Sequence, residues 1–85
     1  MSVPATLPDG SPGEAVAFQG ETLHAVLPRA FAPGAPVQLA LAFPSGSTTV
    51  RGKTQHSKRR QDGRFDVHMR VLDLRRDDRQ RLESL

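Results

Sequence analysis

The fold is most strongly constrained by an alternation of large apolar side chains with small or polar ones in two separate segments. Residues 36–43 ("PVQLALAF") and 65–72 ("FDVHMRVL") keep this period of two along most of their length. Such a period places successive side chains on opposite faces of the chain, which is the pattern of a strand buried on one face. The side chains predicted to face a core are Val37, Leu39, Leu41, Phe43, Phe65, Val67, Met69 and Val71. Both segments are therefore predicted to be β-strands.

Turn residues after the first of these segments predict an antiparallel hairpin. The stretch Pro44–Ser47 ("PSGS") combines a proline, which presets the backbone angle, with a glycine, which accepts positive φ values. Residues 48–56 ("TTVRGKTQH") then alternate weakly, and Gly52 marks a bulge or a close approach of a neighbouring strand. The residues predicted to point inward here are Val50, Gly52, Thr54 and His56. After a polar loop at Ser57–Gly63, the strand at 65–72 completes a three-stranded meander.

Short apolar segments in the first third of the chain predict further strands. These segments are residues 2–7, 15–18 and 22–27. Turn residues separate them at 8–14 ("PDGSPGE") and at Gly20–Glu21, and Pro4 restricts the first segment to a sheet edge or a strand start. The proline-rich stretch Pro28–Pro36 is expected to form an ordered loop before the next strand.

The hydrophobic period changes near the C-terminus, where residues 74–85 are predicted to form a helix. Leu74, Leu82 and Leu85 recur at helical spacing, and Asp73 is a candidate N-cap. The four-residue spacing suggests the ion pairs Asp77–Arg81 and Arg79–Glu83. Because such pairs contribute only about 0.2–0.5 kcal/mol each, the helix is expected to persist only when it docks on the strands.

Length and composition indicate a single small domain spanning residues 1–85. Many short strands, seven glycines and seven prolines predict an all-β fold with one C-terminal helix, a small antiparallel β-barrel of about six strands within residues 2–72. The chain has no cysteine, which excludes disulfides and thiolate metal sites and is typical of a reducing compartment. No apolar run approaches the roughly 18 residues of a membrane span, and the N-terminus lacks a signal-peptide pattern. We therefore expect a cytoplasmic protein without membrane insertion and without a cofactor.

Positive charge is concentrated between residues 51 and 64. The chain has a formal net charge of +3, and in this segment the basic side chains face only one acidic residue, Asp62. The basic residues are Arg51, Lys53, Lys58, Arg59, Arg60 and Arg64. Three interpretations are open: a solvated hairpin, an electropositive surface for an acidic protein, or a phosphate-binding surface for nucleic acid. Nucleic acid is disfavoured because single-strand binders normally add stacking aromatics, and this chain has only four phenylalanines.

A second candidate partner-binding residue is Phe31, which lies between prolines in "PRAFAP". Phe31 either plugs one end of the barrel or is an exposed anchor for another chain. An incomplete barrel would also leave a strand edge that can pair with a partner strand or a second copy, so a homodimer is compatible with the sequence. The candidate partner-binding set is therefore Phe31 and the basic residues of segment 51–64.

Catalytic and metal-binding patterns are missing from the sequence. His24, His56 and His68 lie on different predicted strands without the spacing of a metal site, and no Ser/His/Asp set is evident. His24 and His68 could meet across a sheet, although single strand histidines are usually surface or hydrogen-bonded residues. Asp77 and Asp78 fall in the first turn of the predicted helix, where carboxylates interact favourably with its dipole. We therefore predict that the protein is not an enzyme.

The order of these segments resembles a known family. "FAPGAPVQLALAFPSGSTTVRGKTQH" and "GRFDVHMRVLDLRRDDRQRLESL" follow the usual run of a PilZ domain: a Pro/Gly loop, an alternating strand, a Pro/Gly turn, a "V-x-G-x-V" strand, a further strand, and a helix that begins near "D-L". The resemblance covers residues 28–85, with a looser fit of residues 2–27 to the first strands. It implies a small six-stranded barrel with a C-terminal helix.

The chain departs from PilZ domains in the motifs that bind cyclic di-GMP. Those domains carry an N-terminal R-x-x-x-R clamp and a D/N-x-S-x-x-G turn, but this chain has no arginine before Arg29. "DGSPGE" places Glu14 where the glycine belongs, and residues 17–22 read "AFQGET" at the expected position of the turn. The resemblance therefore implies a non-enzymatic adaptor that binds a partner protein in type IV pilus, motility or related signalling, with cyclic di-GMP disfavoured. The alternative is a cyclic di-GMP or nucleic-acid binding module that uses the basic segment 51–64.

Overall fold

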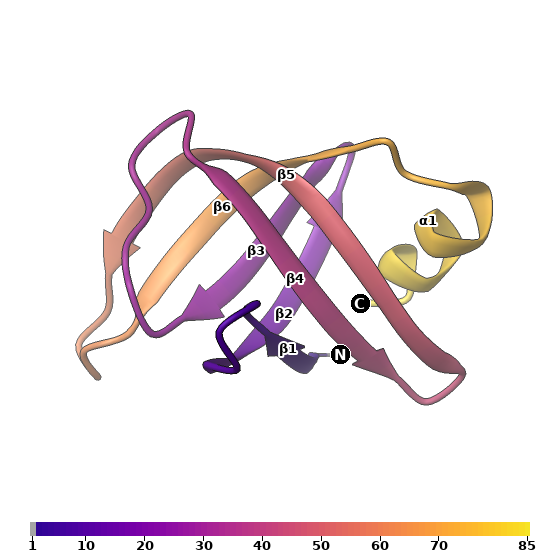
Figure 1. Ribbon diagram of the computed structural model, residues 1–85, viewed down its shortest axis with the longest axis horizontal. Helices are drawn as coiled ribbons and strands as arrows, with labels where there is room; N and C mark the ends of the chain where they lie inside the picture. The colour runs from indigo at the N-terminus through magenta and orange to yellow at the C-terminus, as the bar shows by residue number, and fades with distance from the viewer. Residues whose placement is uncertain (1) are drawn as a thin grey trace.

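Six antiparallel strands close into a barrel in the computed structural model, which describes residues 2–85 (Figure 1). The strands are β1 (Val3–Thr6), β2 (Pro12–Gln19), β3 (Thr22–Leu27), β4 (Pro36–Phe43), β5 (Gly46–Arg59) and β6 (Phe65–Leu72), and the helix is α1 (Arg76–Glu83). Around the barrel the order is β1-β2-β3-β6-β5-β4, and β4 pairs with β1 to close the sheet. The predicted fold class, a six-stranded barrel with one C-terminal helix, is confirmed.

The barrel interior is filled by side chains that the two-residue alternation predicted to face inward. In β4, Val37, Leu39, Leu41 and Phe43 are buried while the residues between them are exposed. Met69 of β6 is also fully buried, and it belongs to the same core cluster as the β4 residues. Burial of this kind is the main favourable contribution to folding, at about 25 cal/mol per Å² of apolar surface.

The path of β5 differs from the prediction after Thr54. The register between β5 and β6 shifts between Thr54 and His56, so that His56 is exposed rather than inward-facing. Beyond the shift, residues 57–59 still pair with β6, so the predicted loop at Ser57–Gly63 is wrong at its start. A bulge inserts one extra residue into a strand and reverses which side chains face the core.

Gly52 is required for close packing between β5 and β6. A Cβ atom at this position would lie 2.1 Å from the carbonyl oxygen of Arg70 and 2.9 Å from Cε of Met69. The bulge of β5 lies two residues further on, between Thr54 and His56. Of the two roles predicted for Gly52, the structure therefore assigns the close approach.

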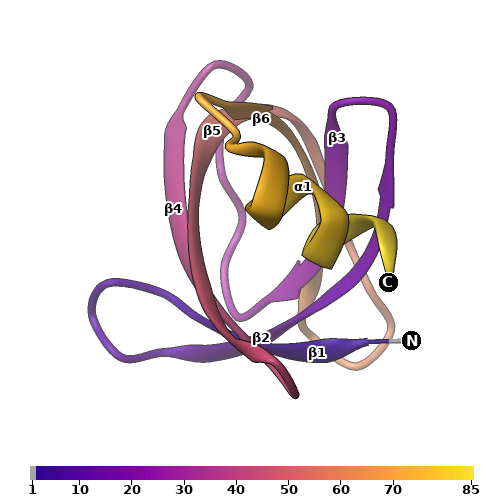
Figure 2. The ribbon, with the colours of Figure 1, turned by 90° about the vertical axis from the view of Figure 1, so that its right-hand side faces the viewer.

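The helix α1 covers one end of the barrel (Figure 2). Its only buried side chain is Leu82, which is fully inaccessible and joins the core cluster. The helix is shorter than predicted, and its N-cap is Arg75, without a side-chain cap, while Asp73 adopts a φ of 53° ahead of it. Neither predicted ion pair forms among residues 2–85: Arg81 pairs with Asp78 at 3.5 Å, and Arg79 donates to the carbonyl of Gly20 at 3.3 Å. Docking of Leu82 therefore holds this short helix in place.

The first strand is short and closes the barrel over a limited length. β1 pairs with β4 only at Ala5↔Leu41 and Thr6↔Ala40. A turn then carries the chain away, with the amide of Leu7 donating to the carbonyl of Ser11 at 2.9 Å. Residues 36–39 of β4 consequently lack a strand neighbour on that side.

No helix within residues 2–85 has the length and apolar character needed to cross a membrane.

Candidate functional site

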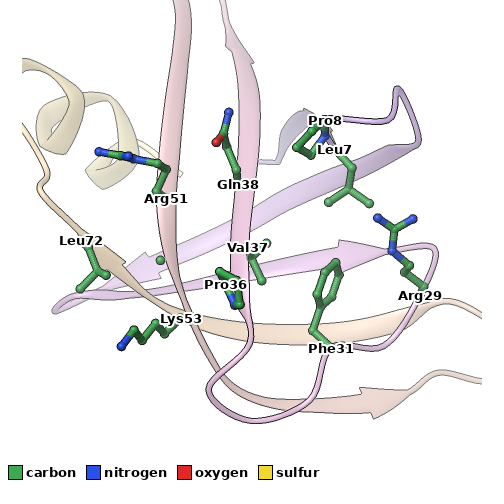
Figure 3. Close-up of a pocket in the computed structure, with 11 residues that line it drawn as sticks. Leu7, Pro8, Arg29, Phe31, Pro36, Val37, Gln38, Arg51, Lys53 and Leu72 are labelled. Carbon is green, nitrogen blue, oxygen red and sulfur yellow. The ribbon is translucent and has the colours of Figure 1, made fainter.

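A surface groove of about 410 Å³ crosses the start of β4, beside the edge that β1 leaves unpaired (Figure 3). Its lining residues are Leu7, Pro8, Arg29, Phe31, Pro36, Val37, Gln38, Arg51, Gly52, Lys53 and Leu72. Figure 3 shows Phe31 and Arg29 on one side of this strand start, with Arg51, Lys53 and Leu72 on the other. The groove thus combines apolar surface with three cationic side chains.

Strand pairing brings the second half of the groove together. Pro36 lies opposite Lys53 and Gln38 opposite Arg51 in the β4–β5 ladder, while Arg51 lies opposite Leu72 in the β5–β6 ladder. All of these side chains belong to the outward-facing set of their strands. Among residues 2–85, Leu72 is the large hydrophobic residue left exposed, at 40% of its surface. Arginine and aromatic side chains are enriched in protein interfaces, and this groove contains Arg51 and Phe31.

Phe31 is held over the groove by its own backbone. Its amide donates to Oγ of Ser57 at 3.1 Å, and that hydroxyl donates back to the Phe31 carbonyl at 2.8 Å. The guanidinium of Arg29 lies 5.5 Å from the centre of the ring, and Arg29 pairs with Asp9 at 2.8 Å. The Phe31 ring is half-buried against the core and also lines the groove, so it is neither a fully buried plug nor a fully exposed side chain, and its role as an anchor stays a prediction.

The basic residues of segment 51–64 do not form one continuous surface. Arg51 and Lys53 line the groove with Phe31, whereas Lys58 and Arg59 are exposed near the far end of β5. Arg60 and Arg64 lie in the β5–β6 hairpin, where acidic side chains pair with them. Arg60 contacts Asp66 at 3.0 Å and Asp62 at 3.5 Å, and Arg64 contacts Asp62 at 3.2 Å and Glu14 at 3.5 Å. Of the candidate set, the structure brings Phe31, Arg51 and Lys53 together in the groove, whereas Lys58, Arg59 and Arg60 line a separate hollow of about 570 Å³ together with Asp62 and Asp66.

The three histidines form a feature that sequence reasoning did not anticipate as a unit. His68 stacks between His24 and His56, with ring centres 4.5 Å and 4.4 Å apart and ring planes within 9° and 20° of parallel. They lie on adjacent strands, because His68 is the cross-strand partner of both. The alternation of the strands allowed a His24–His68 contact to be considered from the sequence. The position of His56 beside His68 could not be predicted, because it depends on the bulge in β5.

An acidic group anchors one end of this histidine row. Nε2 of His24 donates to Oδ1 of Asp66 at 2.8 Å, and the same oxygen accepts a hydrogen bond from Arg60 at 3.0 Å. The hydrogen bond from His24 lowers the pKa of Asp66, and the Arg60 guanidinium adds to this lowering. In residues 2–85 the histidine and acidic side chains form no group of three suited to holding a metal ion.

The central histidine is stabilised in its neutral form. Burial lowers the pKa of His68 below its ordinary value of 6.5, and the neighbouring charges of His24 and His56 lower it further, while Asp66 opposes the shift. Its Nδ1 is buried and has no hydrogen-bond partner within residues 2–85. Protonation of His68 would place a charge between two imidazoles, with only the attraction of Asp66 to offset it.

The folding stability is therefore expected to decrease when the pH falls through the range of histidine titration. Because the pKa of His68 is lower in the folded state, its contribution is complete above the unfolded value of 6.5 and is lost as the pH falls through the folded value. The pKa values of Asp9, Asp62 and Asp66 are lowered from 3.8, so these carboxylates stay ionised in both the folded and the unfolded state over most of the histidine range. They therefore add little to the pH dependence of the folding stability there. Chemical denaturation between about pH 7.5 and about pH 5 measures the slope.

The variant His68→Gln is the matched control for this pH dependence. Glutamine retains a polar side chain on β6 but does not titrate, so the slope between these pH values should become smaller. An unchanged slope in His68→Gln would show that another group is responsible.

No protein-family model matches the chain, and the searches of curated proteins and of solved structures found no match either. Because a small barrel can carry many unrelated functions, the function has to be argued from the groove and its neighbours.

Proposed function

We propose that this barrel is a non-enzymatic adaptor that binds a partner protein in the groove at the start of β4. The segment bound there carries acidic and apolar side chains together. The resemblance of the sequence to PilZ domains supports the proposal that this partner belongs to type IV pilus, motility or related signalling machinery. Within these 85 residues the first arginine is Arg29 and the turn motif of the family is not matched, which favours a role that does not require cyclic di-GMP.

The convergence of Phe31, Leu72, Arg51 and Lys53 on one groove carries this proposal. Within the described residues Lys53 forms no ion pair, and Arg51 lies 3.9 Å from the nearest carboxylate, in a pair whose two side chains are largely exposed. These two charges are thus free to meet carboxylates of a partner. Complementary charges at an interface chiefly raise the association rate and select the partner.

The apolar side chains define the other half of the bound segment. Phe31 and Leu72 lie on opposite sides of Pro36, so a single extended segment that crosses β4 would contact both. Aromatic side chains that are fixed in place are frequent anchors in protein interfaces. Nucleic acid is a poorer fit, because the lining residues of the groove include a single aromatic ring, whereas single-strand binders stack successive bases on several rings.

Selection from a displayed library of random short peptides tests this proposal with the full chain as bait. The expected result is enrichment of peptides that combine Asp or Glu with large apolar residues. The double variant Arg51→Glu/Lys53→Glu should weaken a selected peptide by at least roughly tenfold, and Phe31→Ala should weaken it by a similar factor. Calorimetric or fluorescence titration of a synthetic copy measures these changes.

The matched control is the double variant Lys58→Glu/Arg59→Glu, which changes the same charge outside the groove. Its affinity for the selected peptide should remain close to that of the unmodified chain. Equal loss in both double variants would indicate general charge attraction, and loss in the control alone would place the site at the hairpin. Micromolar binding of cyclic di-GMP, of a short RNA or of a short single-stranded DNA in parallel titrations would contradict the adaptor proposal.

A further inference from the structure

Two β-bulges align one outward-facing row of side chains across four strands. The register shifts between Ala15 and Ala17 in β2, and between Thr54 and His56 in β5. Ala15 and Thr54 are buried, and a regular strand would turn the residue two positions later inward as well. The shifts turn Ala17 and His56 outward instead, and both are exposed. Bulges are known devices for redirecting side chains near functional sites.

The row runs over successive cross-strand partners. Ala17 lies opposite His24, His24 opposite His68, and His68 opposite His56. Three of the four positions carry stacked imidazole rings. The fourth position, in β2, carries only a methyl group, so the stack ends at His24 beside an open space.

A slot of about 350 Å³ occupies this end of the row. Its lining residues are Ala17, Gln19, Thr22, His24 and His68. The side chain of His24 remains 29% exposed, and its hydrogen bond to Asp66 fixes the orientation of the ring. The slot therefore offers a fixed aromatic surface next to a small residue, with an amide and a hydroxyl at its rim.

We propose that this slot receives the aromatic side chain of a tryptophan or tyrosine from a partner protein, as the fourth ring of the row. The ring would stack on His24 above the methyl group of Ala17. The amide of Gln19 supplies an acceptor for an indole N–H or a phenol O–H. Buried tryptophan and tyrosine side chains usually need such a partner for their polar group.

The surrounding charges favour an aromatic side chain over a nucleotide. No Lys or Arg lines the slot, and Arg70, which lies opposite Thr22 on the neighbouring strand, pairs with Glu21 at 3.2 Å. A nucleotide would therefore find a stacking surface but no cation among the lining residues for its phosphate. Recognition here depends on the ring and on one hydrogen bond.

This slot shares no lining residue with the groove at the start of β4. The two proposals can therefore fail separately. The groove variants Arg51→Glu/Lys53→Glu should leave ring binding unchanged, and substitutions at Ala17 should leave the binding of acidic peptides unchanged.

The test is an NMR titration of the isotope-labelled full chain with N-acetyl-tryptophanamide, and in parallel with adenosine. The expected result is a saturable ring-current shift of the Ala17 methyl group and of the His24 ring protons, with half-saturation on the order of millimolar for this single side chain. The variant Ala17→Leu fills the slot at an exposed position and should weaken binding by at least roughly tenfold, read from the His24 protons.

The matched control is His56→Ala, which removes the ring at the opposite end of the row and leaves the slot intact. Its affinity should stay within about twofold of that of the unmodified chain. The proposal is overturned if no saturable shift occurs, if Ala17→Leu binds as well as the unmodified chain, or if His56→Ala abolishes binding while the barrel remains folded. Adenosine that binds at least roughly tenfold more tightly would also overturn it, because the slot would then favour a nucleobase.

Discussion

The variant Gly52→Ala is expected to destabilise the barrel by about 3 kcal/mol, at the upper end of the usual cost of overpacking. The added Cβ would lie 2.1 Å from the Arg70 carbonyl oxygen, and this neighbour is backbone that cannot rotate away. The two strands would have to separate between Gly52 and Val71, which are cross-strand partners in the β5–β6 ladder. Chemical denaturation followed by circular dichroism measures the change.

Gly63→Ala provides the control for this prediction. Gly63 has a φ of 87°, which strains any other residue, but a Cβ there would meet nothing within 4 Å. Its replacement should cost roughly 1 kcal/mol, because only the left-handed backbone is penalised. If Gly52→Ala costs no more than Gly63→Ala, the close approach of β5 and β6 at Gly52 is wrong.

The variant Leu82→Ala is expected to cost about 2–5 kcal/mol, the range for a leucine removed from a packed core. Leu82 is completely buried and is the only buried side chain of α1. A helix of eight residues is not stable alone in water, so loss of this contact should release the helix from the end of the barrel. Amide hydrogen exchange should show loss of protection in α1, and denaturation gives the total change.

Leu72→Ala is the matched substitution for this second prediction. It removes the same atoms from a side chain that is 40% exposed and lies in the groove. Its effect on stability should be about 0.5 kcal/mol or less, with normal protection of α1. Similar losses in the two variants would mean that Leu82 does not anchor the helix.

The barrel presents its two candidate surfaces in different ways. The groove exists because β1 pairs with only two residues of β4 and then turns away. The histidine row exists because bulges in β2 and β5 bring outward-facing residues into one line. In both cases an irregularity of the strands, rather than the regular part of the sheet, creates the surface.

The regular elements could be predicted because their signals are local. The alternation of apolar and polar residues in β4 and β6 matches the alternation of buried and exposed side chains in the structure. A period of two determines which side chains face the core wherever the strand lies in the sheet. The turn residues between β4 and β5 likewise predicted the hairpin that forms there. The ion pairs were harder to predict from the sequence. Arg60 pairs with Asp66 and Arg64 pairs with Glu14, and these pairs form only because the strands that carry them lie side by side.

The positions of the functional candidates depend on long-range pairing. Phe31 and Lys53 share a groove although many residues separate them, because β4 pairs with β5 and the preceding loop lies against β5. His56 faces outward because an extra residue, Gln55, follows Thr54 where β5 pairs with β6. Local periodicity thus predicts the strands and the side chains that they bury. The bulges, the ion pairs between strands and the two candidate surfaces depend on how distant strands pair in the closed sheet, and no short segment of the sequence encodes this pairing.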